Sequence, residues 1–146
     1  MATIRRAEAV WEGDLLSGKG RVSAKSSGIF KDQPVSWAAR TETPDGKTSP
    51  EELLAAAHAS CFAMALSAGL AKNKTPATKL EISAVVTFDK VGAGFKVTSS
   101  ALEVKGSVKG LDAAGFAKAA EAAKDGCPIS QALKGNVELS VKATLA

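Results

Sequence analysis

Residues 48–72 read TSPEELLAAAHASCFAMALSAGLAK, and they predict the central element of the fold. Ser49 suits the N-cap of a helix, Pro50 suits its first turn, and Glu52 stands three residues after the cap, as in a capping box. No charged residue follows Glu52 before Lys72. Because a helix that is apolar all round is a buried helix, we expect a helix from Pro50 to about Lys72 that is packed on most sides.

Three short strands are expected before this helix. They are predicted at residues 3–11, 21–26 and 34–40, with glycine-rich or serine-rich turns between them. Side chains of a strand repeat every two residues, so Val35 and Trp37 should share one face of the third strand. Arg40 ends that strand, and a turn-rich connection then leads to the helix.

A hairpin, a second helix and a last strand are expected after it. The predicted ranges are strands at 79–89 and 95–105, a helix at 113–124, a short helix at 128–134 and a strand at 136–144. Asp112 is the expected N-cap of the second helix, and Gly126 is expected to end it in the left-handed conformation. The order β-β-β-α-β-β-α-β in one domain, 1–146, indicates the α+β class with a mainly antiparallel sheet.

Composition favours an ordinary globular protein. Apolar residues make up 45% of the 146 and charged residues 23%, with a net charge of +4. Lys and Arg are scattered, with no run longer than Arg5-Arg6, and aromatics are few, so nucleic acid is not an expected partner. No apolar run approaches the roughly 18 to 20 residues that cross a bilayer, and the start lacks the apolar region of a secretory signal. We therefore expect a cytoplasmic protein with no membrane partner.

The chain has two cysteines, Cys61 and Cys127, and a single histidine. A secreted disulfide scaffold usually carries more cysteines, and a zinc site usually needs four ligands. The two cysteines are therefore either inert buried thiols or a redox pair.

The surroundings of the two cysteines differ. Cys61 lies in the middle of an apolar helix, where an unassisted thiol is a small, inert hydrophobe. Cys127 stands between Gly126 and Pro128 at the expected start of a helix, whose free N–H groups stabilise a thiolate. Local electrostatics alone makes Cys127 the better nucleophile, and a structural role remains open for both.

Charged residues near the central helix offer a partner for a thiol. Arg40 is either a solvated strand end or the partner of Glu51, and a guanidinium fixed by a carboxylate can lower a thiol pKa and donate to a peroxide oxygen. Glu51 and Cys61 stand ten residues apart, about 15 Å along one helix. If both serve one site, Glu51 should come from a second subunit. His58, one turn before Cys61, could act as a base but is expected to be a satisfied core residue.

Two motifs together resemble one known family. Residues 48–67, with Cys61, and Gly126-Cys127-Pro128-Ile129-Ser130-Gln131 resemble the OsmC/Ohr family of osmotically induced proteins and organic hydroperoxide reductases. The segments 11–14 (WEGD) and 89–95 (DKVGAGF) look like the OsmC branch. The resemblance covers nearly the whole chain, in order.

This resemblance implies a fold and a set of site residues. The implied fold is an intertwined homodimer in which mainly antiparallel sheets wrap two central helices. Cys61 matches the family's peroxidatic cysteine, Cys127 its resolving cysteine and Glu51 its glutamate. The family's arginine matches Arg40, with Arg21 as the alternative, and Gly18-Lys19-Gly20 in place of the Ohr-like Gly-Arg pattern favours Arg40.

The resemblance also implies a reaction. Thiolate Cys61 reduces an organic hydroperoxide, and hydrogen peroxide more weakly, to the alcohol, and the resulting sulfenic acid condenses with Cys127 to a disulfide. An external dithiol, such as a dihydrolipoyl group, then reduces the disulfide, and no metal, haem or flavin is implied. The alternatives are a non-catalytic stress-induced binding protein and a thiol redox sensor on the same fold.

Overall fold

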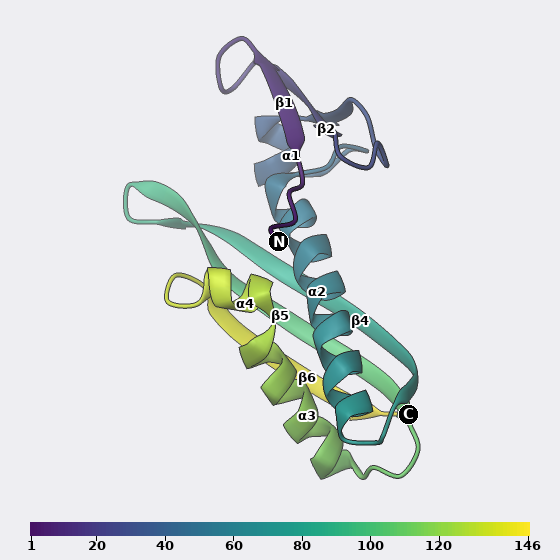
Figure 1. The fold of residues 1–146 in the computed structure, drawn as a ribbon. Coiled ribbons are helices and arrows are strands. Elements are labelled where there is room, and N and C mark those ends of the chain that lie inside the picture. The colour runs from purple at the N-terminus through teal and green to yellow at the C-terminus, as the bar shows by residue number, and fades with distance from the viewer. The chain divides into compact units, whose positions relative to one another are not determined.

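A three-stranded antiparallel sheet lies in the first of two units in the chain, Met1–Leu53. Its strands lie in the order β1 (Ala7–Glu12), β2 (Lys19–Ala24) and β3 (Gln33–Val35). The computed structural model describes all residues, 1–146. The second unit, Leu54–Ala146, is described by itself below, and Figure 1 draws the whole chain.

The third strand is shorter than predicted, because a helix begins where the strand was expected to continue. After Val35, Ser36 caps helix α1 (Trp37–Thr41), and its hydroxyl accepts a hydrogen bond from the Ala39 N–H at 3.1 Å. The prediction of a strand to residue 40 was therefore wrong, since a good N-cap outweighed the short alternation of apolar side chains. As a result, Arg40 lies in the last turn of a helix.

Helix α2 (Pro50–Lys72) has the predicted bounds. The Ser49 hydroxyl accepts from the Glu52 N–H at 3.1 Å, which is the expected cap. The Glu52 carboxylate accepts from the Thr48 hydroxyl at 2.8 Å. The Glu52 side chain thus binds Thr48, the residue before the N-cap. In a capping box it would instead accept from the backbone N–H of Ser49.

The burial of α2 differs from the prediction. Its fully buried side chains in the second unit form one row at four-residue spacing: His58, Phe62, Leu66 and Leu70. The opposite face is uncharged and exposed, and it carries Ala56, Ser60, Met64, Ser67, Ala68 and Ala71. Only 22% of the most apolar 18-residue window is buried within this chain. The expectation of a helix packed on most sides was wrong for the single chain, because its large apolar side chains fall mainly on one row.

The length and composition of α2 also correct the expectation that no apolar run could cross a bilayer. The helix is long and apolar enough to do so, because alanine sustains its hydropathy between the larger side chains. One such helix is weak evidence of a membrane protein, since the core helix of a soluble protein passes the same test.

The second unit is built on a sheet in the order β4–β5–β6. Strands β4 (Ala77–Val91) and β5 (Gly94–Val108) form the predicted antiparallel hairpin, and β6 (Glu138–Leu145) pairs with β5 in parallel. Helices α3 (Ala113–Gly126) and α4 (Pro128–Leu133) lie in the crossover that a parallel pair requires. The α2 residues of this unit and α3 pack on the same face of the sheet (Figure 1). The predicted α+β class with mainly antiparallel pairing is confirmed.

The junction between α3 and α4 places the second cysteine. Asp112 caps α3 as predicted, accepting from the Gly115 N–H at 2.7 Å. Gly126 is the last helical residue and does not take the left-handed conformation that was expected of it. Cys127 is extended instead, and it is both the C-cap of α3 and the N-cap of α4. This bend turns the Cys127 side chain into the core, where it is fully buried.

Candidate functional site

The second unit brings the two cysteines together, although 66 positions separate them in the sequence. Cys61 is half-buried on α2, Cys127 is fully buried at the start of α4, and both are free thiols. The two thiols lie close enough for each to shift the pKa of the other. We call them the thiol pair.

The pKa values of the two thiols are shifted in opposite directions from the usual value for cysteine. Burial raises the pKa of Cys61, and the hydrogen bond with Cys127 raises it further, against a smaller lowering by the Ile129 backbone. Burial would also raise the pKa of Cys127, but the Ser130 backbone, the Cys61 thiol and the Ser130 hydroxyl outweigh burial and lower it. Within this unit the negative charge of the pair therefore favours Cys127, as the local electrostatics of the sequence predicted.

The donors at the start of α4 interact mainly with the ionised form of the Cys127 sulfur. The Cys127 side chain makes no capping hydrogen bond of ordinary geometry. A neutral thiol is a weak acceptor, whereas a thiolate accepts strongly from nearby N–H and O–H groups. The donors of Ile129 and Ser130 thus act mainly on the ionised sulfur.

Replacing Cys127 by alanine should lower the pKa of Cys61. The variant removes the Cys127 sulfur, which favours the protonated form of Cys61. Only the thiolate is alkylated, so Cys61 should react with iodoacetamide faster at neutral pH, with the midpoint of its pH profile at lower pH than in the wild type. The exposed neighbour Ser60 offers a control, since Ser60→Ala should leave the profile in place. A midpoint that stays or rises in Cys127→Ala would contradict the coupling.

The first unit brings Arg40 and Glu51 together. The Arg40 Nε lies 3.1 Å from both carboxylate oxygens of Glu51, and Nη2 lies 2.7 Å from Oε1. Glu51 is only 8% exposed, and the Trp37 ring faces the guanidinium, with its centroid 5.9 Å from Cζ. Glu51 thus holds the Arg40 guanidinium in place, and this arginine–glutamate pair is one of the two alternatives that the sequence left open for Arg40.

Arg21, the alternative arginine, lies in a different setting. It forms long ion pairs with Glu12 and Asp32, at 3.8 and 3.9 Å, and its side chain is 47% exposed. Solvent screens such pairs strongly. Of the two candidates, Arg40 is therefore the one that the fold holds rigidly beside Glu51.

A buried polar network adjoins the thiol pair. His58 is fully buried, with Nδ1 2.6 Å from the Ser100 hydroxyl on β5 and Nε2 2.8 Å from the Ser130 hydroxyl on α4. Burial lowers the pKa of His58, so the imidazole is neutral at neutral pH. This agrees with the expectation of a satisfied core histidine. The two serines were missed, although a serine three residues after Cys127 is a visible signal, because residue N3 of a helix faces its cap.

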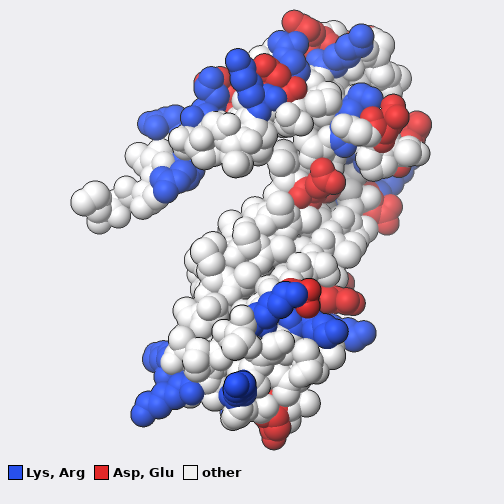
Figure 2. Space-filling view, turned by 90° about the vertical axis from the view of Figure 1, so that its right-hand side faces the viewer, with Lys and Arg blue, Asp and Glu red and all other residues white.

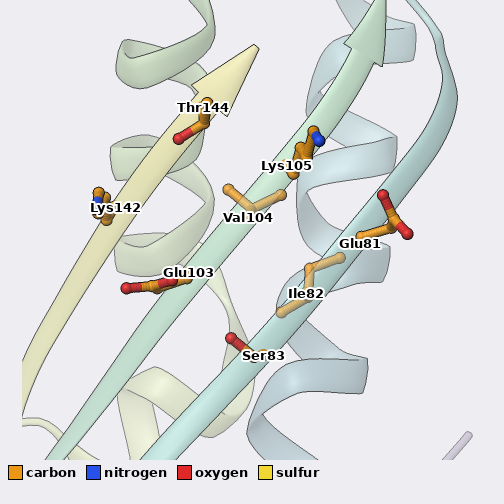
Figure 3. A pocket seen from close by; sticks show the side chains of 8 residues that line it. All are labelled: Glu81, Ile82, Ser83, Glu103, Val104, Lys105, Lys142 and Thr144. Atoms are coloured by element: carbon orange, nitrogen blue, oxygen red, sulfur yellow. The ribbon is translucent and has the colours of Figure 1, made fainter. Parts of the chain in front are cut away.

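Two surface hollows differ in their chemistry. One, of about 350 Å³ in the first unit, is lined by Trp11, Leu15, Val35, Ser36, Trp37, Arg40 and Pro50. The other, of about 420 Å³, lies on the exposed face of the β4–β5–β6 sheet (Figure 3). There Glu81 pairs in register with Lys105, and Glu103 with Lys142. The sheet hollow thus carries solvated cross-strand charge pairs, whereas the first hollow joins apolar side chains to Arg40.

The charged side chains and the possible metal ligands were also compared with the two hollows. On the face that Figure 2 shows, Lys and Arg are interspersed with Asp and Glu, without one large basic patch. No group of three or more His, Cys, Asp or Glu side chains could hold a metal ion.

Comparison with known proteins gives consistent matches. The family model described as OsmC-like protein matches residues 43–142. The peroxiredoxin OsmC of Escherichia coli is 44% identical over 139 residues, 95% of this chain and 96% of that protein. The organic hydroperoxide resistance protein OhrB of Bacillus subtilis has a crystal structure with a TM-score of 0.75 and 26% identity, covering 95% of this chain and 98% of that one. An OsmC-like protein from Mycoplasma pneumoniae, 14% identical, shares the fold with a TM-score of 0.74 over 100% of this chain and 99% of that one.

Proposed function

Since this chain belongs to the OsmC-like protein family, we propose that it reduces organic hydroperoxides through Cys61 and Cys127. Its relatives include a peroxiredoxin and organic hydroperoxide resistance proteins, so peroxidase activity in peroxide defence is its general role. The proposal extends this role to the individual residues, the substrate class and the reductant.

One observation carries the proposal: the two cysteines of the chain interact directly while both are free. A sulfenic acid on one cysteine would form beside a thiol that can resolve it. Buried cysteines that serve only to fill space need no such pairing.

In the proposed cycle, the Cys61 thiolate attacks an oxygen of the hydroperoxide, the O–O bond breaks and an alcohol leaves. Cys61 becomes a sulfenic acid, and the Cys127 sulfur displaces its hydroxide to form the disulfide, with release of water. An external dithiol, such as a dihydrolipoyl group, restores both thiols and is itself oxidised to a disulfide. Cys61 is the nucleophile because it is the more accessible sulfur, whereas Cys127 is fully buried.

Burial and Cys127 both raise the pKa of Cys61 and so favour its thiol form. A cation at the site is therefore needed to stabilise the Cys61 thiolate. Arg40, held by Glu51, is the proposed cation, and it also stabilises the charge that develops on the peroxide oxygens. The hollow beside Arg40 is lined mostly by apolar side chains, Trp11, Leu15 and Trp37 among them. It suits the organic part of a hydroperoxide, so hydrogen peroxide should be the poorer substrate.

The arginine–glutamate pair and the thiol pair are proposed to meet across a homodimer. Glu51 and Cys61 stand about 15 Å apart along one helix, so one chain cannot present both to the same peroxide by helix geometry alone. The exposed, uncharged face of α2, with Met64 68% exposed, is the proposed contact with the second subunit. The proposal includes no nucleic acid or membrane partner, no bound cofactor and a cytoplasmic location.

The test is turnover of cumene hydroperoxide and of hydrogen peroxide by the wild-type protein, with dihydrolipoamide in excess. We expect many turnovers with the organic substrate and a kcat/KM at least about tenfold lower with hydrogen peroxide, since an apolar group bound in a hollow contributes about 1–3 kcal/mol. Oxidation of one equivalent without turnover would point to a redox sensor, and the absence of any reaction to a binding protein.

A further inference from the structure

A single imidazole joins three elements of the second unit. Nδ1 of His58 on α2 lies 2.6 Å from the Ser100 hydroxyl on β5, the central strand of the sheet, and Nε2 lies 2.8 Å from the Ser130 hydroxyl on α4. All three side chains are at most 1% exposed. A hydroxyl can both donate and accept, so either tautomer of the imidazole satisfies both serines. The network is therefore complete within the core.

The two helix residues of this network stand close to the two cysteines in the sequence. His58 comes one helical turn before Cys61 on α2, and Ser130 comes three residues after Cys127, the N-cap of α4. Cys127 belongs to the core cluster of the second unit, and Cys61 packs against that cluster. The hydrogen bond between His58 and Ser130 therefore links the same two helices that a disulfide of the thiol pair would link.

The position of α4 depends on contacts with the rest of the unit. The helix has only six residues, Pro128–Leu133, and isolated helices shorter than about 12–15 residues are marginal in water. Ser130 is its one fully buried side chain, and Ile129 beside it is only partly buried against the core. The hydrogen bond to His58 is thus a buried and directional contact that can fix the start of α4, where Cys127 lies.

We propose that His58 is a positioning residue, which binds Ser130 and so holds the start of α4 on α2 with Cys127 within reach of Cys61. This inference rests on the proposed function, in which the two sulfurs close a disulfide. Closure joins groups on two different elements, so its equilibrium constant depends on how firmly the fold holds them together. Ser100 binds the same imidazole from the sheet and lies outside the link between the two helices.

The test is the equilibrium of the disulfide of the thiol pair with glutathione. The protein gives two electrons and two protons to one glutathione disulfide, which becomes two glutathione thiols. Reduced protein is equilibrated in buffers of different glutathione ratio, quenched with acid, alkylated and weighed by mass spectrometry. In Ser130→Ala we expect an equilibrium constant for closure about tenfold lower than in the wild type, because the start of α4 is held less firmly.

Ser100→Ala is the matched control for this variant. Each of the two substitutions leaves one buried nitrogen of the same imidazole unpaired, so both should lower the melting temperature of the reduced protein similarly. The closure constant of Ser100→Ala should nevertheless stay within about twofold of the wild type, since the link between the helices remains. A decrease as large as that in Ser130→Ala would show a general loss of stability and would overturn the inference, as would an unchanged constant in Ser130→Ala.

A second pair of variants separates the hydroxyl from the shape of the side chain. Thr and Val are close in shape, but only Thr keeps a hydroxyl that can bind His58. The closure constant should be about tenfold higher in Ser130→Thr than in Ser130→Val, even if the added methyl groups cost stability in both. Equal constants in these two variants would refute the role of the hydrogen bond.

Unfolding by urea measures the same coupling in another way. Residue 130 has no bearing on closure in an unfolded chain, so Ser130→Ala should raise the unfolding constant about tenfold more in the oxidised than in the reduced protein. Ser100→Ala should raise both alike, and equal rises in Ser130→Ala would contradict the inference.

None of these measurements uses peroxide, so the two proposals can fail separately. If the wild type closes the disulfide but does not reduce cumene hydroperoxide, the proposed function fails, and the variants still decide the role of His58. If the wild type closes no disulfide in any glutathione buffer, the positioning role fails.

Discussion

Cys61→Ser should abolish peroxide reduction, with kcat/KM for cumene hydroperoxide lower by about a thousandfold or more, as expected for loss of a covalent nucleophile. A serine hydroxyl does not ionise near neutral pH, and it cannot pass through a sulfenic acid. The measurement is hydroperoxide consumption with dihydrolipoamide in excess. The substitution exchanges sulfur for oxygen on a half-buried residue, so the fold should persist, as circular dichroism can verify.

Cys127→Ser is the matched variant for this prediction. It should still consume one equivalent of hydroperoxide, and it should then stop at the Cys61 sulfenic acid or oxidise further, since the resolving thiol is missing. The opposite pattern, in which Cys61→Ser turns over and Cys127→Ser does not react, would identify Cys127 as the nucleophile. That outcome is a real rival, because the donors of Ser130 lower the pKa of Cys127 in this unit.

The sequence predicted the long helix and the hairpin well, because each depends on a strong local signal. The Ser49-Pro50 start set the first residue of α2, and the alternation in 79–89 and 95–105 set the paired strands. The prediction from the sequence was wrong where a helix cap competed with the pattern of apolar residues or with a glycine signal. Ser36 begins a helix inside the expected third strand, and Gly126 stays helical because the bend falls on Cys127.

The polar network of the core could be predicted only in part. The expectation that His58 is a satisfied core residue was right, but its two partners come from β5 and α4, which are far away in the sequence. Contacts between distant segments depend on the register of the sheet and on the packing of the helices, and neither can be read from local propensity. Arg40 pairs with Glu51 from helix α1, and the sequence had predicted a strand there because its apolar residues alternate.

Arg40→Lys should lower kcat/KM for cumene hydroperoxide about a hundredfold, and Arg40→Ala should lower it at least as much. Arg40 uses two nitrogens to bind both carboxylate oxygens of Glu51, and a lysine cannot reproduce this fork. Loss of one preorganised donor to developing charge costs about 10²–10³ in rate. If Arg40 favours the Cys61 thiolate, its loss raises the pKa of Cys61, so the activity that remains should recover as pH rises. Lost activity with an unchanged pH profile would contradict this role.

Mixing two inactive variants should restore activity if Arg40 serves the Cys61 of a second subunit. In a dimer of one Cys61→Ser chain and one Arg40→Ala chain, the intact cysteine of the second chain faces the intact arginine of the first. Random exchange makes about half of the dimers mixed, each with one complete site of two, so about one quarter of the wild-type activity should return. If each chain supplied its own arginine, no mixed dimer would hold a complete site, and the mixture would stay inactive. Glu51→Gln mixed with Cys61→Ser should behave like the Arg40 mixture, because Glu51, 8% exposed, holds the guanidinium in the same subunit.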